Sequence, residues 1–186
     1  RAAMARTVLP DAYTWAQIRL GVDVSRYGDD PTVIFPRQGS KAFQPEEMRH
    51  ARDSTVSTNI AERVLAMRAK MGGDGGIYLD ATGGWAAGAR DVMASQLPRQ
   101  QWPVSVQFHA PDHEKKYKNR RAGGWFRMAE WTLAGGCLPN VPELVGELTI
   151  PTYAFYNGQF QMEDKDQVKE RLGRSPADRR RGEEAR

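Results

Sequence analysis

The chain has 186 residues, 40% hydrophobic and 27% charged, so it is long enough to bury a core and its composition excludes a disordered protein. Its net charge of +4 fits a polyanionic partner, and its single cysteine, Cys137, excludes an intramolecular disulfide framework or a cysteine-based zinc site. It contains no signal peptide and no apolar run of about 18 residues, so we expect one soluble α/β domain without a membrane span.

The first part of the chain alternates between strand and helix patterns. Apolar residues at every second position predict a strand over 17–24, and the Gly- and Asp-rich turn at 26–31 predicts a hairpin with the next strand. Ser57 or Thr58 is the expected cap of the first helix. Up to Asp80 we expect strands over 17–24, 32–37, 41–44 and 77–79 and a helix over 59–71.

A glycine-rich turn follows Asp80, and helices then dominate. The dipeptide Asn157-Gly158 is a strong signal for a two-residue hairpin turn. A hairpin followed by alternating helices and strands predicts a mixed β-sheet flanked by helices on both faces. Beyond Asp80 we expect helices over 85–96, 117–133, 142–148 and 165–172, a strand over 104–108, and hairpin strands over 153–155 and 159–162.

Three aspartates are candidate metal ligands. Asp23 is near the end of the first strand and Asp80 ends a later one, and functional groups of open α/β sheets collect beyond the carboxyl ends of strands. If the two strands are neighbours, Asp23 and Asp80 can share a divalent cation, with Asp29 folding back toward it. Such oxygen ligands suit Mg²⁺ or Mn²⁺. Taken alone, each aspartate is more often a turn former or a helix cap.

Basic residues cluster near the start of the helix expected over 117–133. They can bind phosphates without reading sequence, or they form a solvated helix face. His109 and His113 are separated by Pro111, so we expect them in a loop. The basic cluster consists of Lys115, Lys116, Lys118, Arg120, Arg121 and Arg127.

Several segments resemble, in order, the nuclease domain of phage and prophage large terminase subunits. The stretch 21–34 (GVDVSRYGDDPTVI) resembles its first acidic hairpin, and 78–88 (YLDATGGWAAG) its second acidic strand and glycine turn. The stretches 117–122 and 125–128 resemble its long basic helix. The remaining matches are at 138–140, 143–144, 151–153 and 172–176.

The resemblance implies an RNase H-like fold and an endonuclease that uses two Mg²⁺ or Mn²⁺ ions to cut double-stranded DNA during viral genome packaging. Asp23 and Asp80 match catalytic acids, and Asp29 an accessory ligand. The two ions would activate an in-line water and neutralise charge on the leaving oxygen. The third catalytic ligand departs from the pattern, because after Ser175-Pro176 the nearest acid, Asp178, is offset and followed by three arginines. Alternatively, Asp178 belongs to a solvated terminus.

The resemblance also implies an organisation and partners. Because the chain opens with Arg1, we expect a fragment in which residues 1–16 lead in from a preceding ATPase domain, 17–176 form the nuclease domain and 177–186 an atypical charged tail. No Walker motif is present, so we expect no ATPase. Implied partners are DNA, the terminase small subunit and the portal, at the virion assembly site in the bacterial host cytoplasm, with the isolated domain monomeric.

Two alternatives to the nuclease remain open. One is a non-catalytic DNA-binding or docking module on the same fold, disabled by the altered tail. The other is an actin-like or sugar-kinase-like nucleotide binder, which also carries an aspartate on its first strand but requires glycine-rich phosphate loops. DNA cleavage that depends on metal favours the nuclease. DNA binding that is unaffected by metal favours the docking module, and stabilisation by ATP favours the nucleotide binder.

Overall fold

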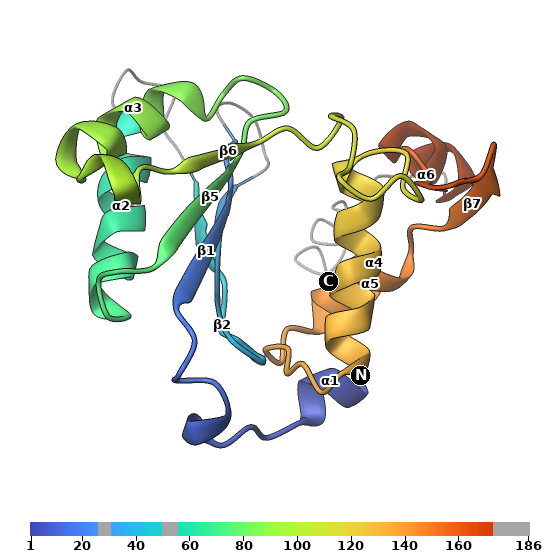
Figure 1. Ribbon diagram of the computed structural model, residues 1–186, viewed down its shortest axis with the longest axis horizontal. Coiled ribbons are helices and arrows are strands. Elements are labelled where there is room, and N and C mark those ends of the chain that lie inside the picture. Colours follow the sequence, from blue (N-terminus) through green and yellow to red (C-terminus); the bar gives the residue numbers. More distant parts are fainter. Residues whose placement is uncertain (26–30, 50–55, 173–186) are drawn as a thin grey trace, which may run out of the picture. The chain divides into compact units, whose positions relative to one another are not determined.

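A computed structural model describes residues 1–25, 31–49 and 56–172, which divide into two compact units (Figure 1). The sheet unit comprises Ala2–Phe108 and Trp131–Pro139. The hairpin unit comprises Arg1, His109–Glu130 and the described part of Asn140–Arg186. No helix of the described residues is long and apolar enough to cross a membrane.

The sheet unit is built on a mixed six-stranded sheet of order β3-β2-β1-β5-β6, with β4 paired to β2. β1 and β2 are antiparallel, which confirms the predicted hairpin, whereas β5 is parallel to β1 and β6 is parallel to β5. β4 was not predicted, because its sequence Glu-Glu-Met has no apolar alternation. The strands are β1 (Ile18–Asp23), β2 (Thr32–Gln38), β3 (Lys41–Ala42), β4 (Glu46–Met48), β5 (Gly76–Asp80) and β6 (Val104–Val106).

Helices α2 (Val56–Lys70) and α3 (Ala87–Gln96) pack with the sheet around one hydrophobic core. The alternation that predicted the strands places one set of side chains in this core, and each buried Leu, Ile or Met contributes about 1.5–3 kcal/mol to folding. Figure 1 shows α2 and α3 beside β5 and β6. The largest fully buried side chains of the core are Leu20, Ile34, Ile60, Ile77, Leu79 and Met93.

Both helix starts differ from the predicted ones. α2 begins at Val56, so Ser57 and Thr58 lie inside the helix and the expected cap is wrong. Val56 is buried in the core, and burial of this apolar side chain favours one more turn of helix. α3 begins at Ala87, two residues after Trp85, because Gly84 has a φ of 75° and closes a turn onto the carbonyl of Ala81.

Short elements complete the sheet unit: the helix α1 (Ala2–Ala5) and the 3-10 turns η1 (Pro10–Ala12) and η2 (Arg99–Gln101). The buried Arg68 of α2 donates hydrogen bonds to the carbonyl of Gly75 and the side chain of Gln101, both at 2.8 Å. These bonds satisfy a guanidinium that burial would otherwise destabilise, and they tie the end of α2 to the turn before β6.

The hairpin unit contains the predicted elements. Asn157 and Gly158 have φ values of 51° and 76°, so the predicted two-residue turn between β7 and β8 is confirmed. α4 is continuous through Gly123 and Gly124 but begins three residues later than expected, because Tyr117 forms a β-bridge with Phe160 instead. The elements are α4 (Arg120–Leu133, which continues into the sheet unit), α5 (Pro142–Thr149), β7 (Tyr153–Tyr156), β8 (Gln159–Met162) and α6 (Lys165–Leu172).

Candidate functional site

Asp23 and Asp80 lie at the carboxyl ends of neighbouring parallel strands. The ladder between β1 and β5 ends with the pair Val22 and Leu79, and each aspartate is the next residue of its strand. Val22 and Leu79 are buried, so alternation turns both aspartate side chains to the opposite face of the sheet. The fold therefore brings two carboxylates, 57 residues apart in sequence, to one edge and one face.

The backbone after β5 holds the carboxylate of Asp80. Its Oδ1 accepts a hydrogen bond of 2.8 Å from the backbone N–H of Thr82. The Thr82 hydroxyl in turn accepts a bond of 3.2 Å from the N–H of Phe108, and the Ala81 N–H donates to the carbonyl of Val106 at 3.0 Å. This side-chain-to-backbone turn fixes the carboxylate relative to β5 and β6. Thr82 was not among the predicted site residues, although an Asp that leads into a glycine-rich turn often accepts a hydrogen bond from the backbone two residues on.

The remaining predicted ligands, Asp29 and Asp178, lie outside the described residues. Of the predicted ligands, this edge of the sheet therefore presents Asp23 and Asp80 within the described part of the chain. Two carboxylates at adjacent strand ends are hard oxygen donors, the ligand type that Mg²⁺ and Mn²⁺ prefer.

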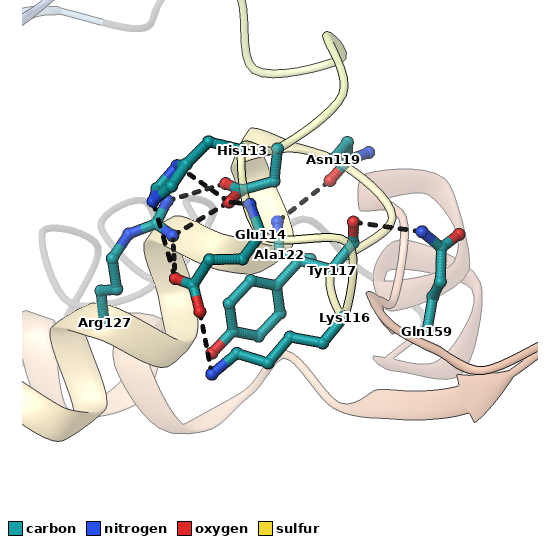
Figure 2. A network of polar contacts seen from close by, with 9 residues as sticks. His113, Glu114, Lys116, Tyr117, Asn119, Ala122, Arg127 and Gln159 are labelled. Carbon is teal, nitrogen blue, oxygen red and sulfur yellow. Dashed lines mark hydrogen bonds and ion pairs between the residues drawn. The ribbon is translucent and has the colours of Figure 1, made fainter.

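A second acidic group lies in the hairpin unit, where Asp112, His113 and Glu114 bring their ligand atoms within 4.8 Å of one another. Arg127 already supplies positive charge there. Its guanidinium donates to Oδ2 of Asp112 at 2.8 Å and to Oδ1 of Asp112 and Oε1 of Glu114, both at 3.1 Å. Figure 2 shows these contacts and the ion pair of 3.0 Å between Lys116 and Glu114. Cationic side chains thus neutralise both carboxylates, and the group needs no metal ion to balance its charge.

The network shifts the pKa values of its members. The hydrogen bond from Arg127 lowers the pKa of Asp112 to about 2, and the hydrogen bond from Lys116, followed by that from Arg127, lowers the pKa of Glu114. Bonding to Asp112 raises the pKa of Arg127. The network therefore stays charged at neutral pH and fastens the loop before α4 to the third turn of that helix.

All six basic candidates fall in the hairpin unit, but their surroundings differ. Arg127 and Lys116 belong to the network, and Arg121 lies 3.6 Å from a carboxylate oxygen of Asp164. The Lys118 ammonium donates to Gln161 at 3.0 Å. Lys115 and Arg120 are exposed and form no ion pair with another described residue.

His109 and His113 are in a loop, as predicted. His113 is exposed, with its Nδ1 3.2 Å from Asp112.

A mixed sheet flanked by helices, with an antiparallel hairpin leading into parallel strands, places the protein in the RNase H-like fold class and confirms that prediction. Solved structures of a phage terminase nuclease domain are among its structural neighbours. The nuclease domain of the large terminase subunit gp2 of bacterial virus Sf6 superimposes with a TM-score of 0.65 and 18% identity, over 86% of this chain and 83% of that chain.

Two further Sf6 structures, both of a lysine-to-alanine variant, give similar values. The calcium-containing structure has a TM-score of 0.68 and 17% identity over 87% of this chain and 85% of that chain. The manganese-containing structure has a TM-score of 0.67 and 15% identity over 86% and 83%. No protein-family model and no curated protein matches the sequence. The likeness thus establishes that this chain has the fold of the terminase nuclease domain.

Proposed function

We propose that this chain is a metal-dependent endonuclease, the nuclease domain of a large terminase subunit, which hydrolyses phosphodiester bonds of double-stranded DNA during genome packaging. The observation that carries the proposal is the placement of Asp23 and Asp80 at adjacent carboxyl strand ends on one face of an RNase H-like sheet. The Sf6 domain with this fold is a nuclease whose variant was solved with manganese and with calcium, which supports a divalent cation as cofactor.

The two carboxylates fit such a cofactor by their chemistry. Both are hard oxygen donors, and Asp80 is oriented by the N–H of Thr82, as the ligands of a preorganised site are. Bound Mg²⁺ or Mn²⁺ would supply a water of lowered pKa and neutralise charge on the phosphate. Asp23 and Asp80 would hold the ions. We propose Asp178 as a third ligand and Asp29 as an accessory one.

The basic segment of the hairpin unit would bind the DNA backbone. Lys115, Lys118 and Arg120 are exposed, and their charges can neutralise phosphates without regard to sequence. Lys116 and Arg121 would contribute less, because each already lies near a carboxylate. Arg127 would act indirectly, since its guanidinium is bound to Asp112 and Glu114 and holds the loop that carries the lysines.

The proposed organisation and partners follow the terminase likeness. Residues 1–16 would lead in from an ATPase domain, 17–176 would form the nuclease domain, and 177–186 a charged tail. The terminase small subunit and the portal are the proposed protein partners, and the bacterial host cytoplasm the proposed site of action.

Cleavage of supercoiled plasmid tests the proposal. The chain is incubated with plasmid in Mn²⁺, Mg²⁺ or EDTA, beside Asp23→Ala, Asp80→Ala and Asp178→Ala. Asp91→Ala is the matched control, because this aspartate of α3 is 75% exposed and pairs only at the surface with Arg90. We expect nicking and linearisation that require metal, vanish in the first two variants and persist in the control. The Asp178→Ala variant tests whether the altered tail supplies the third metal ligand.

A metal titration followed by thermal unfolding separates the candidate functions. Mn²⁺ should raise the melting temperature of the wild type and of Asp91→Ala, but not of Asp23→Ala or Asp80→Ala, because a ligand that binds only the folded state stabilises it. DNA retention on a gel without cleavage in any metal would refute the nuclease and leave a DNA-binding module. Stabilisation by ATP would instead support a nucleotide binder.

A further inference from the structure

Two arginines face each other across the first hairpin of the sheet unit. Arg19 of β1 is directly opposite Arg37 of β2 in the antiparallel ladder. Side chains in such a pair start from β-carbons about 4.5–5.5 Å apart, and like charges there destabilise a sheet. Burial, and after it the charge of Arg19, lowers the pKa of Arg37. Among the described residues, neither arginine forms an ion pair with a carboxylate.

The guanidinium of Arg37 is held in a fixed orientation. Its carbon lies 5.6 Å from the centroid of the Trp131 ring, and its Nη1 donates a hydrogen bond of 3.2 Å to the carbonyl of Gly39. The indole N–H of Trp131 donates to the same carbonyl at 3.1 Å. Toward the described residues Arg37 makes this one hydrogen bond, so its other N–H groups are available to a ligand.

Tyr78 of β5 adds a hydroxyl to the arginine pair. Its ring leans over Gly76, because a β-carbon on Gly76 would lie 3.2 Å from the Tyr78 hydroxyl. Gly76 is paired with Arg19 in the parallel ladder of β1 and β5. Arg19 is exposed, and Arg37 and Tyr78 are partly exposed, so all three side chains offer donors to a ligand from solvent.

This group is on the same face of the sheet as the candidate metal ligands. Buried and exposed residues alternate along β1, and Arg19, Gly21 and Asp23 are the exposed ones, on the face away from the core. Four residues separate Arg19 from Asp23, which is roughly 13 Å at about 3.3 Å per residue. Gly21 adds no side chain between them. One end of the face therefore carries carboxylates and the other carries guanidinium groups.

A strand of DNA matches both ends of this face. Each strand of a duplex carries one phosphate per about 3.4 Å of helix axis, so a strand bound at the carboxylates through metal ions has further phosphates within roughly 13 Å. The planar guanidinium group donates paired hydrogen bonds to phosphate oxygens. A phosphate between Arg19 and Arg37 would also relieve the repulsion between their charges.

We infer that Arg19, Arg37 and Tyr78 form a binding site for a backbone phosphate of the DNA strand that is cut, separate from the scissile phosphate. Contacts to phosphate position the strand along the sheet without reading its sequence. The inference rests on the proposed function for its choice of DNA. Neither arginine was among the predicted DNA-binding residues, because alternation alone marks both as ordinary solvent-facing strand positions.

Fluorescence anisotropy of a labelled duplex in EDTA tests the site without cleavage. Arg19→Gln should weaken binding about 5- to 20-fold, in the lower part of the range for a charge-assisted hydrogen bond because Arg19 is exposed. The slope of log affinity against log salt should fall by about 0.9, the value for one phosphate contact. Arg19→Lys should keep that slope. The loss should be equal on duplexes of unrelated sequence, since the contact is to the backbone.

Arg99→Gln is the matched control. It removes the same charge from an exposed residue of η2, a turn bonded to α2 rather than part of this face. Because distant exposed charges are screened by salt, affinity should change less than about twofold. Tyr78→Phe keeps the ring and removes the hydroxyl, so it should weaken binding about 2- to 10-fold and leave the salt slope unchanged.

Thermal unfolding guards against a folding defect. Arg19→Gln should be at least as stable as the wild type, because it removes the repulsion with Arg37. Unchanged DNA affinity in Arg19→Gln, an equal loss in Arg99→Gln, or a wild type that binds no DNA would overturn the inference. So would stabilisation of the wild type by inorganic phosphate with DNA affinity independent of Arg19, since the site would then take small anions.

The two proposals fail separately. Asp23→Ala and Asp80→Ala should not weaken binding in EDTA, because no metal ion is then present to link these carboxylates to the DNA. Absence of cleavage in every metal, with a DNA affinity that still depends on Arg19, would refute the nuclease alone. Metal-dependent cleavage with a DNA affinity indifferent to Arg19 would refute the phosphate site alone.

Discussion

Two adjacent glycines of helix α4 give a sharp test of the Asp112–Arg127 ion pair. A β-carbon added at Gly123 would lie 2.7 Å from both Cγ of Asp112 and Nη2 of Arg127, closer than real β-carbons approach other atoms. A β-carbon added at the neighbouring Gly124 meets nothing within 4 Å. The same substitution at two consecutive positions of one helix therefore differs only in whether it disturbs the pair.

The gain in helix propensity and the loss of the ion pair change the free energy of unfolding in opposite directions. Replacing Gly by Ala inside a helix stabilises it by about 1 kcal/mol, so Gly124→Ala should raise the free energy of unfolding by that amount. Gly123→Ala gains the same helix propensity, but it displaces Arg127 from the carboxylate of Asp112, whose side chain has no exposed surface. Breaking such a pair costs about 2–4 kcal/mol here, below the value for a fully buried pair because Arg127 is 38% exposed. We expect a net loss of about 1–3 kcal/mol.

Thermal or urea unfolding followed by circular dichroism measures both variants against the wild type. A shift of 1 kcal/mol corresponds to about 2–4 °C in melting temperature for a chain of this size. In an Arg127→Gln background, where the pair is already absent, the penalty of Gly123→Ala should shrink. Equal stabilisation by Gly123→Ala and Gly124→Ala would refute the reasoning, because Asp112 would then have moved aside without loss.

Three further outcomes are expected. Because the pKa of Asp112 is lowered from 3.8 to about 2, its ionised carboxylate contributes fully to the stability of the fold at neutral pH, and this contribution is lost as the pH falls from 3.8 through about 2. In acid-unfolding curves, the stability difference between the wild type and Asp112→Asn should therefore vanish over the same pH range. Gly75→Ala should destabilise the sheet unit by more than about 1 kcal/mol in urea unfolding, since its β-carbon would lie 2.6 Å from the carbonyl oxygen of Ile18. Ile60→Ala, at 1% exposure, should cost about 2–5 kcal/mol, whereas Leu133→Ala, at 83% exposure, should stay within about 0.5 kcal/mol.

The sequence by itself determined the elements whose signals are local. Alternating apolar residues placed β1 and β2, and the dipeptide Asn157-Gly158 placed the turn between β7 and β8, because backbone preferences and side-chain periodicity act within a few residues. The ends of β1 and β5 could likewise be read from the chain, which marked Asp23 and Asp80 as candidates. The expected helix cap failed because burial of Val56, a tertiary effect, outweighed the local signal of Ser57.

Only the tertiary structure decided which of these elements became neighbours. The pairing of β5 with β1 turned two separate aspartates into an adjacent pair, and no local pattern in either strand specifies that choice. Arg127 was predicted to bind phosphate, but the packing of its helix places its guanidinium on Asp112, 15 residues earlier in the chain. Contacts of this kind depend on where distant segments meet, which is governed by the burial of the whole core rather than by the residues of any one segment.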